Sequence, residues 1–175
     1  MEAVSKIISR VSGVLLLALI MLSTPSCGVY SFTGASIPAE AKTISIQYFQ
    51  NNALLVEPLL SGEFTNALRD RFMSQTSLNM VSQNGDLAFE GEITDYRTTP
   101  VAIQSDQTAA LNRLEIKVNV RFTNKYDEST NFETQFTQYK EYRSEQDLNA
   151  IKTELITEIV AMLVDDIFNK SVVNW

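Results

Sequence analysis

Residue types that carry much of the common catalytic chemistry are scarce in this chain. None of its 175 residues is histidine, and only one is cysteine. No Ser–His or Cys–His nucleophile pair can therefore form, and no imidazole can bind a metal ion. Only chemistry based on carboxylates, lysine or tyrosine remains available, and the sequence predicts neither a metal site nor a cofactor.

Positive charge is also in short supply. The chain has 14 Lys and Arg residues against 21 Asp and Glu residues, a net charge of -7. A protein that binds nucleic acid by neutralising phosphates normally shows the opposite sign, so we expect no nucleic-acid partner. The hydrophobic content of 45%, with only 6 Gly and 4 Pro, is typical of a globular chain, and this length fits one domain.

No apolar run is long enough for a stable membrane-spanning helix. The longest extends from Val11 to Leu22, which at a rise of about 1.5 Å per residue covers ~18 Å of a ~30 Å hydrocarbon layer. Lys6 and Arg10 precede this run, and small residues follow it at 23–26. The three parts together predict a secretory signal peptide over residues 1–26.

Cys27 comes directly after the predicted signal peptide. A cysteine in this position, preceded by a small residue, is where a lipoprotein-processing enzyme attaches acyl chains, so we predict Cys27 as the lipidated N-terminus. The alternative is an unpaired cysteine near an ordinary cleavage site, which would be a liability in an oxidising compartment. Thr24 and Pro25 depart from the usual motif, which has Leu three residues before the cysteine. Gly28 is not the Asp that retains some lipoproteins at the inner membrane, which favours the outer membrane.

Residues 27–42 are predicted to form a tether, and residues 43–175 a single domain. From Thr43 to Gln50 polar and apolar residues alternate, which is typical of a half-buried strand. Pro58 suits the first turn of a helix that we expect to end near Gln75. The apolar stripe of this helix comprises Leu60, Phe64, Ala67, Leu68 and Phe72.

Strand patterns dominate the middle of the domain. An alternation that begins at Leu87 is expected to break at residues 98–100 (Thr-Thr-Pro), and a polar loop is expected at 104–108. The clearest strand covers residues 114–126, and Leu114, Ile116, Val118, Val120 and Phe122 share one of its faces. Together with residues 131–142 it predicts a hairpin.

A second helix is predicted after Ser144, which forms a capping-box pattern with Asp147. Its main apolar stripe comprises Leu148, Ile151, Leu155, Ile159 and Met162, widened by Ile156, Val160, Leu163 and Ile167. Such a wide apolar face must cover a sheet. The predicted fold class is therefore α+β, with two helices packed on one face of a four- or five-stranded, mostly antiparallel sheet.

Several segments, in this order and spacing, resemble the lipopolysaccharide-assembly lipoprotein family LptE, in particular its Bacteroidetes branch. The resemblance covers essentially the whole chain after residue 26. It rests on CGVY (27–30), TISIQYFQNNA (43–53), FTNALRDRF (64–72), GDLAFEGEITDY (85–96), NRLEIKVNVRF (112–122) and IFNKSVVNW (167–175).

The resemblance implies a small, non-enzymatic outer-membrane lipoprotein. Proteins of this family sit as a plug inside the β-barrel of LptD, assist its assembly and contact lipopolysaccharide. The implied partners are therefore an LptD-type barrel and lipopolysaccharide, and the implied location is the outer membrane, with the domain in the periplasm or in the barrel lumen. Two alternatives stay open: a periplasmic ligand-binding lipoprotein unrelated to lipopolysaccharide export, and a lipid-anchored carboxylate hydrolase.

Lys117, Arg121 and Lys125 form a basic row on one face of the clearest strand, with steps of about 13 Å at ~3.3 Å per residue. In a protein of this family, such cations suit the phosphates or acidic sugars of lipopolysaccharide. The alternative is a solvent-exposed face whose charges pair across the strands with Glu133, Glu141, Glu90 or Glu92.

Two other groups of residues are candidates for a function. Glu90 and Glu92 are spaced ~6.6 Å apart along a strand, within the range of a two-carboxylate glycosidase, but they fit a solvent-exposed surface better. Four aromatic residues near the chain ends are candidates for contact with a barrel wall or for ordinary core packing: Tyr30, Phe32, Phe168 and Trp175.

Overall fold

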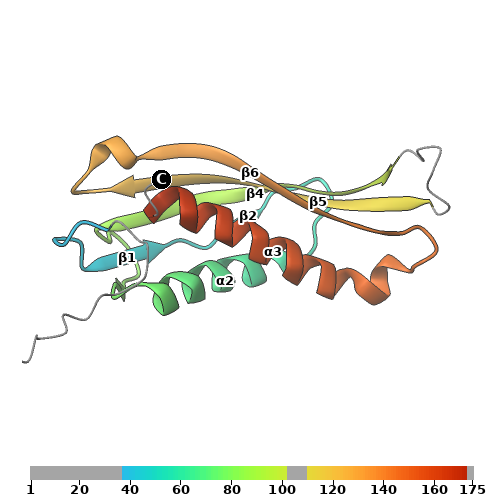
Figure 1. Cartoon of the computed structure of the whole chain (residues 1–175), viewed down its shortest axis with the longest axis horizontal. Coiled ribbons are helices and arrows are strands. Elements are labelled where there is room, and N and C mark those ends of the chain that lie inside the picture. The colour runs from blue at the N-terminus through green and yellow to red at the C-terminus, as the bar shows by residue number, and fades with distance from the viewer. Residues whose placement is uncertain (1–36, 102–109, 173–175) are drawn as a thin grey trace, which may run out of the picture. The chain divides into compact units, whose positions relative to one another are not determined.

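The computed structural model describes residues 37–101 and 110–172, which form a sheet covered on one face by two helices (Figure 1). The predicted α+β class is confirmed. The sheet has six strands, slightly more than the four or five expected, because two of them are only two residues long. The elements in chain order are β1 (Thr43–Ile46), β2 (Gln50–Asn51), α2 (Leu60–Gln75), β3 (Asn79–Met80), β4 (Leu87–Val101), β5 (Leu111–Asn124), η1 (Glu128–Thr130), β6 (Phe132–Arg143) and α3 (Leu148–Val172).

The strands lie in the order β3-β1-β4-β5-β6, and β2 also pairs with β4. Strand β1 is parallel to both β3 and β4, so α2 forms the crossover between parallel strands β1 and β3. The long ladders β4–β5 and β5–β6 are antiparallel, and they make the sheet mostly antiparallel as predicted. The hairpin expected between residues 114–126 and 131–142 is the β5–β6 pair.

Helix α2 has the predicted stripe. Its residues at every fourth position, from Leu60 to Phe72, are fully buried against the sheet. The helix ends at Gln75, where both the amide and the hydroxyl of Thr76 donate to the carbonyl oxygen of Phe72. These bonds satisfy a carbonyl group that the helix end leaves without an intrahelical partner.

Helix α3 begins differently from the prediction. The carboxylate of Asp147 accepts a hydrogen bond from the amide of Asn149 at 3.0 Å, so Asp147, rather than Ser144, caps the helix. The buried face also differs from the main predicted stripe, since three residues of that stripe, Leu148, Ile151 and Met162, are only partly buried. The buried residues of α3 are Leu155, Ile156, Ile159, Val160, Leu163, Val164, Ile167, Phe168, Ser171 and Val172.

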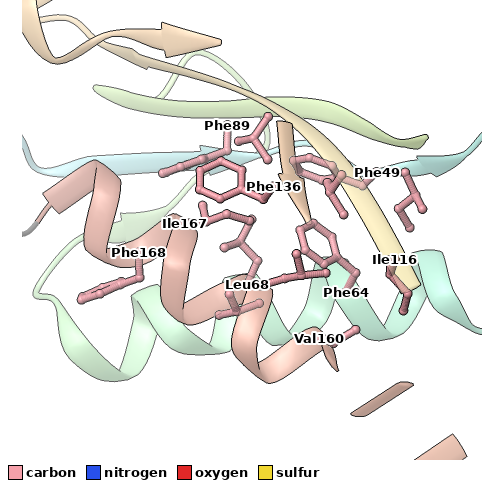
Figure 2. Close-up of a cluster of buried hydrophobic side chains, with 14 of the residues drawn as sticks. Phe49, Phe64, Leu68, Phe89, Ile116, Phe136, Val160, Ile167 and Phe168 are labelled. Carbon is pink, nitrogen blue, oxygen red and sulfur yellow. The ribbon is translucent and has the colours of Figure 1, made fainter. Parts of the chain in front are cut away.

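The core lies between the helices and the inward face of the sheet, where Figure 2 shows side chains of both helices meeting those of the strands. The inward residues of β5 are at most 1% exposed: Leu114, Ile116, Val118, Val120 and Phe122. Phenylalanine rings connect the two layers, since Phe72 lies 4.9 Å from Phe89 and 5.0 Å from Phe168, centroid to centroid. Ala41, in the predicted tether, is 5% exposed and belongs to the same core.

Strand β4 does not break at residues 98–100, contrary to prediction. It continues to Val101, with Pro100 opposite Asn112 of β5. A bulge between Ile93 and Asp95 adds one residue and shifts the register. Proline is tolerated here because, in the part of the chain that the structure describes, β4 has a strand neighbour on its β5 side alone at this point. The loop expected at 104–108 lies outside the described residues.

Neither helix of the described region combines the length and apolarity needed to cross a membrane.

Candidate functional surface

The helices leave the other face of the sheet uncovered, and the basic row lies there. Arg121 is exposed, with 58% of its side chain accessible. Its Nε donates to Glu133 Oε2 at 3.1 Å, and its Nη1 lies 3.9 Å from Glu90 Oε2. The hydrogen bond from Arg121, with one from Asn119, lowers the pKa of Glu133. Arg121 is thus held between carboxylates of the two neighbouring strands.

Lys117 belongs to a cluster of two cations and two carboxylates on β4 and β5. Its Nζ lies 3.5 Å from Glu115 Oε1 and 3.7 Å from Asp95 Oδ2. Arg97 binds the same two carboxylates, at 2.6 Å from Glu115 and 3.3 Å from Asp95. The four charges cancel, so this cluster presents polar groups without a net charge.

Lys125 follows the end of β5, and its Nζ donates to the carbonyl oxygen of Asn84 at 2.7 Å. It lies near Asp86, whose pKa is lowered mainly by the amide of Lys42 and the hydroxyl of Thr43, with a smaller contribution from the charge of Lys125. Each member of the basic row is therefore engaged within the domain. Binding of lipopolysaccharide by this row stays a prediction.

An apolar loop of residues 53–59, between β2 and α2, is the most exposed hydrophobic feature of the described region. The exposed fractions of its side chains are 107% for Leu54, 58% for Leu55, 61% for Val56 and 64% for Leu59. The single charge in the loop, that of Glu57, is turned inward and only 7% exposed. An exposed aliphatic patch of this kind marks an interaction site more often than an isolated surface leucine does.

Glu57 fixes the apolar loop to the body of the domain. Its Oε2 accepts a hydrogen bond from Lys152 Nζ on α3 at 2.9 Å, and its carbonyl oxygen accepts one from Asn51 Nδ2 at 3.2 Å. Beneath the loop, burial raises the pKa of Tyr96, and the charge of Glu57 adds to that rise. The loop is thus held in place while its aliphatic side chains remain exposed.

Comparison with known proteins covers the whole of this domain. Residues 41–171 match the family described as LptE, lipopolysaccharide-assembly. The chain belongs to the LptE family. This membership supports a lipoprotein that acts in lipopolysaccharide assembly, and the family is non-enzymatic. No curated protein sequence matches the chain.

Solved structures of similar architecture include two bacterial lipoproteins. The minor lipoprotein from Acinetobacter baumannii is 12% identical with a TM-score of 0.49, over 74% of this chain and 91% of that one. The rare lipoprotein B from Shewanella oneidensis is 13% identical with a TM-score of 0.46, over 73% and 92%. A putative neuraminyllactose-binding hemagglutinin homolog from Helicobacter pylori is 9% identical with a TM-score of 0.50, over 84% and 88%, and shares the fold alone.

Glu90 and Glu92, the two carboxylates spaced like those of a glycosidase, have structural partners in this LptE-family domain. Glu90 accepts a hydrogen bond from Gln47 Nε2 at 2.8 Å, and Glu92 accepts one from Asn52 Nδ2 at 2.5 Å. Both side chains thus tie the segment after β1 to β4. Over residues 37–101 and 110–172, no group of three or more acidic residues or cysteines has the arrangement of a metal site.

The remaining sites predicted from the sequence have different outcomes. Phe168 is 6% exposed and packs in the core against Phe72, so it is not a surface contact. Cys27, Tyr30, Phe32 and Trp175 lie outside the described residues. The apolar loop was missed in the sequence, although four aliphatic residues between a strand and a proline are a signal for it.

Proposed function

We propose that this chain is a non-enzymatic lipoprotein subunit of the lipopolysaccharide export machinery. Cys27 is acylated after removal of residues 1–26, and residues 27–42 tether the domain to the outer membrane. The domain occupies the lumen of an LptD-type β-barrel, assists its assembly and contacts lipopolysaccharide. The observation that carries this proposal is the LptE match across residues 41–171.

The surface of the domain supports this role. The uncovered face of the sheet presents paired charges and polar side chains, which suit the polar interior of a large membrane barrel. An acyl anchor would also raise the effective concentration of the domain beside a barrel in the same membrane.

Affinity purification of the tagged full-length protein from detergent-solubilised membranes tests the partnership. We expect a β-barrel protein in a one-to-one ratio, and depletion of the chain should lower the amount of lipopolysaccharide at the cell surface. Recovery of the chain alone, together with normal surface lipopolysaccharide after depletion, would contradict the proposal.

Mass spectrometry of the membrane-extracted protein tests the anchor. We expect an N-terminal peptide that begins at Cys27 and carries acyl chains. The Cys27→Ser variant should keep the residues before position 27 and fail to receive the acyl groups. An unmodified thiol in the wild-type protein would exclude the anchor.

A further inference from the structure

Strand β4 has an open edge next to the apolar loop. Strand β2 pairs with β4 only at Glu92 and Ile93, and the last bond on this side joins the amide of Asn52 to the carbonyl oxygen of Ile93 at 2.9 Å. The chain then turns away toward α2, whereas β4 and β5 continue together to Val101 (Figure 1). Beyond Ile93, β4 is thus paired on its β5 side alone within the described residues.

The alternation of backbone groups shows which residues point to this edge. Before the bulge, Phe89 and Ile93 direct their carbonyl groups toward β1 and β2. The bulge adds one residue, so that Tyr96, Thr98 and Pro100 take this direction after it. Pro100 has no amide to leave unpaired. Among residues 37–101 and 110–172, the ladder groups without a partner at this edge are therefore the N–H and C=O of Tyr96 and Thr98.

A hollow of about 600 Å³ lies along this edge. The apolar loop provides one wall through Leu54 and Leu55, and β4 provides Tyr96, Arg97 and Thr98. The hydroxyl of Thr98 is buried and has no hydrogen-bond partner among the described residues. Unpaired backbone groups, an unsatisfied hydroxyl and a fixed aliphatic wall thus meet in one place.

We propose that an extended segment of the barrel partner adds to β4 at Tyr96 and Thr98 and places aliphatic side chains against Leu54 and Leu55. This inference rests on the proposed function. Free N–H and C=O groups in ladder geometry require a peptide backbone, which favours a protein segment over a lipid chain. The strands of a closed barrel have no spare ladder groups, so the segment must come from a loop or a terminal extension of the barrel protein.

The other open edge of the sheet, on β6, lacks these features. The residues of β6 whose backbone groups face this edge include Glu133 and Glu141. Charged residues on an edge strand discourage pairing with another chain. This edge therefore supplies a matched control.

Thr98→Pro removes the free amide at the β4 edge and leaves the β4–β5 ladder intact, because the groups of Thr98 point away from β5. Thr137→Pro makes the same change at the open edge of β6. Leu54→Gln replaces one of the two aliphatic side chains of the wall, at a fully exposed position. Met73→Gln, on the exposed side of α2, is its control. Because Leu54 makes no core contact, its variant tests the inference even if a proline variant does not fold.

Each full-length variant is purified from detergent-solubilised membranes, and the barrel recovered per chain is measured. We expect Thr98→Pro and Leu54→Gln each to lower recovery at least ~fivefold, the effect of losing about one hydrogen bond or one buried aliphatic contact. The two control variants should stay within about twofold of the wild type, as changes outside the contact do. Thermal unfolding of each variant confirms that it is folded.

Photo-crosslinking identifies the occupant directly. With benzoylphenylalanine in place of Leu54, we expect an adduct with the barrel protein, and with the probe at Met73 none. An adduct only with lipid or with a second copy of the chain would overturn the inference. If the wild type recovers the barrel and both test variants recover as much, the proposed function stands and this inference fails. If the wild type recovers no barrel, both fail.

Discussion

At Gly91 the backbone of β4 passes so close to its neighbours that no side chain fits. A Cβ atom built there would collide with the carbonyl oxygen of Asn119 on β5 and lie 2.7 Å from the ring of Phe49. The φ angle of +156° is also one that residues with a side chain rarely adopt. The glycine thus allows Phe49, which is fully buried, to pack under the sheet.

Gly91→Ala should therefore destabilise the domain. We expect a loss of about 1–3 kcal/mol in the free energy of unfolding, because the added methyl group forces strand or ring displacement. Gly62→Ala is the control, since a Cβ there meets nothing within 4 Å and lies in a helix, where alanine is favoured. Urea denaturation measures both, and equal stability of the two variants would contradict this account.

Asp86 gives the domain a defined dependence on pH. Its carboxylate accepts hydrogen bonds from the amides of Lys42 and Thr43 and from the Thr43 hydroxyl, and these bonds lower its pKa from the ordinary 3.8. A carboxyl group with a lowered pKa stabilises the folded state above its unfolded pKa. That stabilisation is lost as the pH falls through the folded pKa.

Asp86→Asn should thus lower the melting temperature at pH 7, and the difference from wild type should shrink as the pH falls below 3.8. Glu145, which is exposed and has no hydrogen bond or ion pair among the described contacts, provides the control. Glu145→Gln should melt close to wild type across this range. A difference for Asp86→Asn that is the same at pH 7 and pH 3 would disprove the role of its ionisation.

At the scale of elements, a partly buried ion pair joins α3 to the apolar loop. Lys152 of α3 reaches Glu57, whose side chain is 9% exposed, across 95 positions of sequence. The pair between Lys140 of β6 and Glu158 of α3 has a similar length of 2.8 Å but is more exposed, at 39% and 45%. Loss of the lysine should cost more stability at the buried pair, because water can replace the lost partner only at the exposed pair.

Lys152→Met should lower the free energy of unfolding by about 1–3 kcal/mol, since it leaves a buried carboxylate without its cation. Lys140→Met should change it by less than about 1 kcal/mol. Hydrogen exchange should also show faster exchange of amides in residues 53–59 for Lys152→Met alone. Unchanged exchange there would mean that the ion pair does not hold the loop.

At the scale of the whole molecule, the basic row and the edge of β4 share one region of the surface, since Lys117 also lines the hollow beside the apolar loop. Lys117 and Arg121 are paired with carboxylates, and Lys125 donates to the carbonyl oxygen of Asn84, so a phosphate group must displace these partners. Such an exchange is favourable only where the ligand supplies several charges at once, as lipopolysaccharide does.

Replacement of Lys117, Arg121 and Lys125 by alanine should therefore weaken binding of purified lipopolysaccharide, and the difference should shrink at high salt. The variant in which Lys140, Arg143 and Lys170 become alanine loses the same charge elsewhere and serves as the control. Equal binding by the two folded variants would show that the row does not recognise lipopolysaccharide.

The alternation in β5 and the four-residue spacing in α2 were enough to predict the fold class, the hairpin and the inward faces. Those patterns are local, and burial of one face enforces them. The errors arose where a distant contact decides. Residues 98–100 extend β4 because they pair with β5 on one side. Asp147, rather than Ser144, caps α3, because the amide of Ser144 still donates to Ala110 at the end of the sheet and the helix begins only after the following turn.

Composition and periodicity are sufficient to predict a histidine-free, acidic domain with two apolar helix faces and a two-sided sheet. The arrangement of groups on the surface depends instead on the tertiary structure. That structure pairs Lys117 with Asp95 and Arg121 with Glu90 and Glu133, turns Glu57 inward onto Lys152, and leaves Leu54 and Leu55 exposed beside the open edge of β4. Each of these contacts joins residues far apart in the chain, and no local pattern specifies which of them meet.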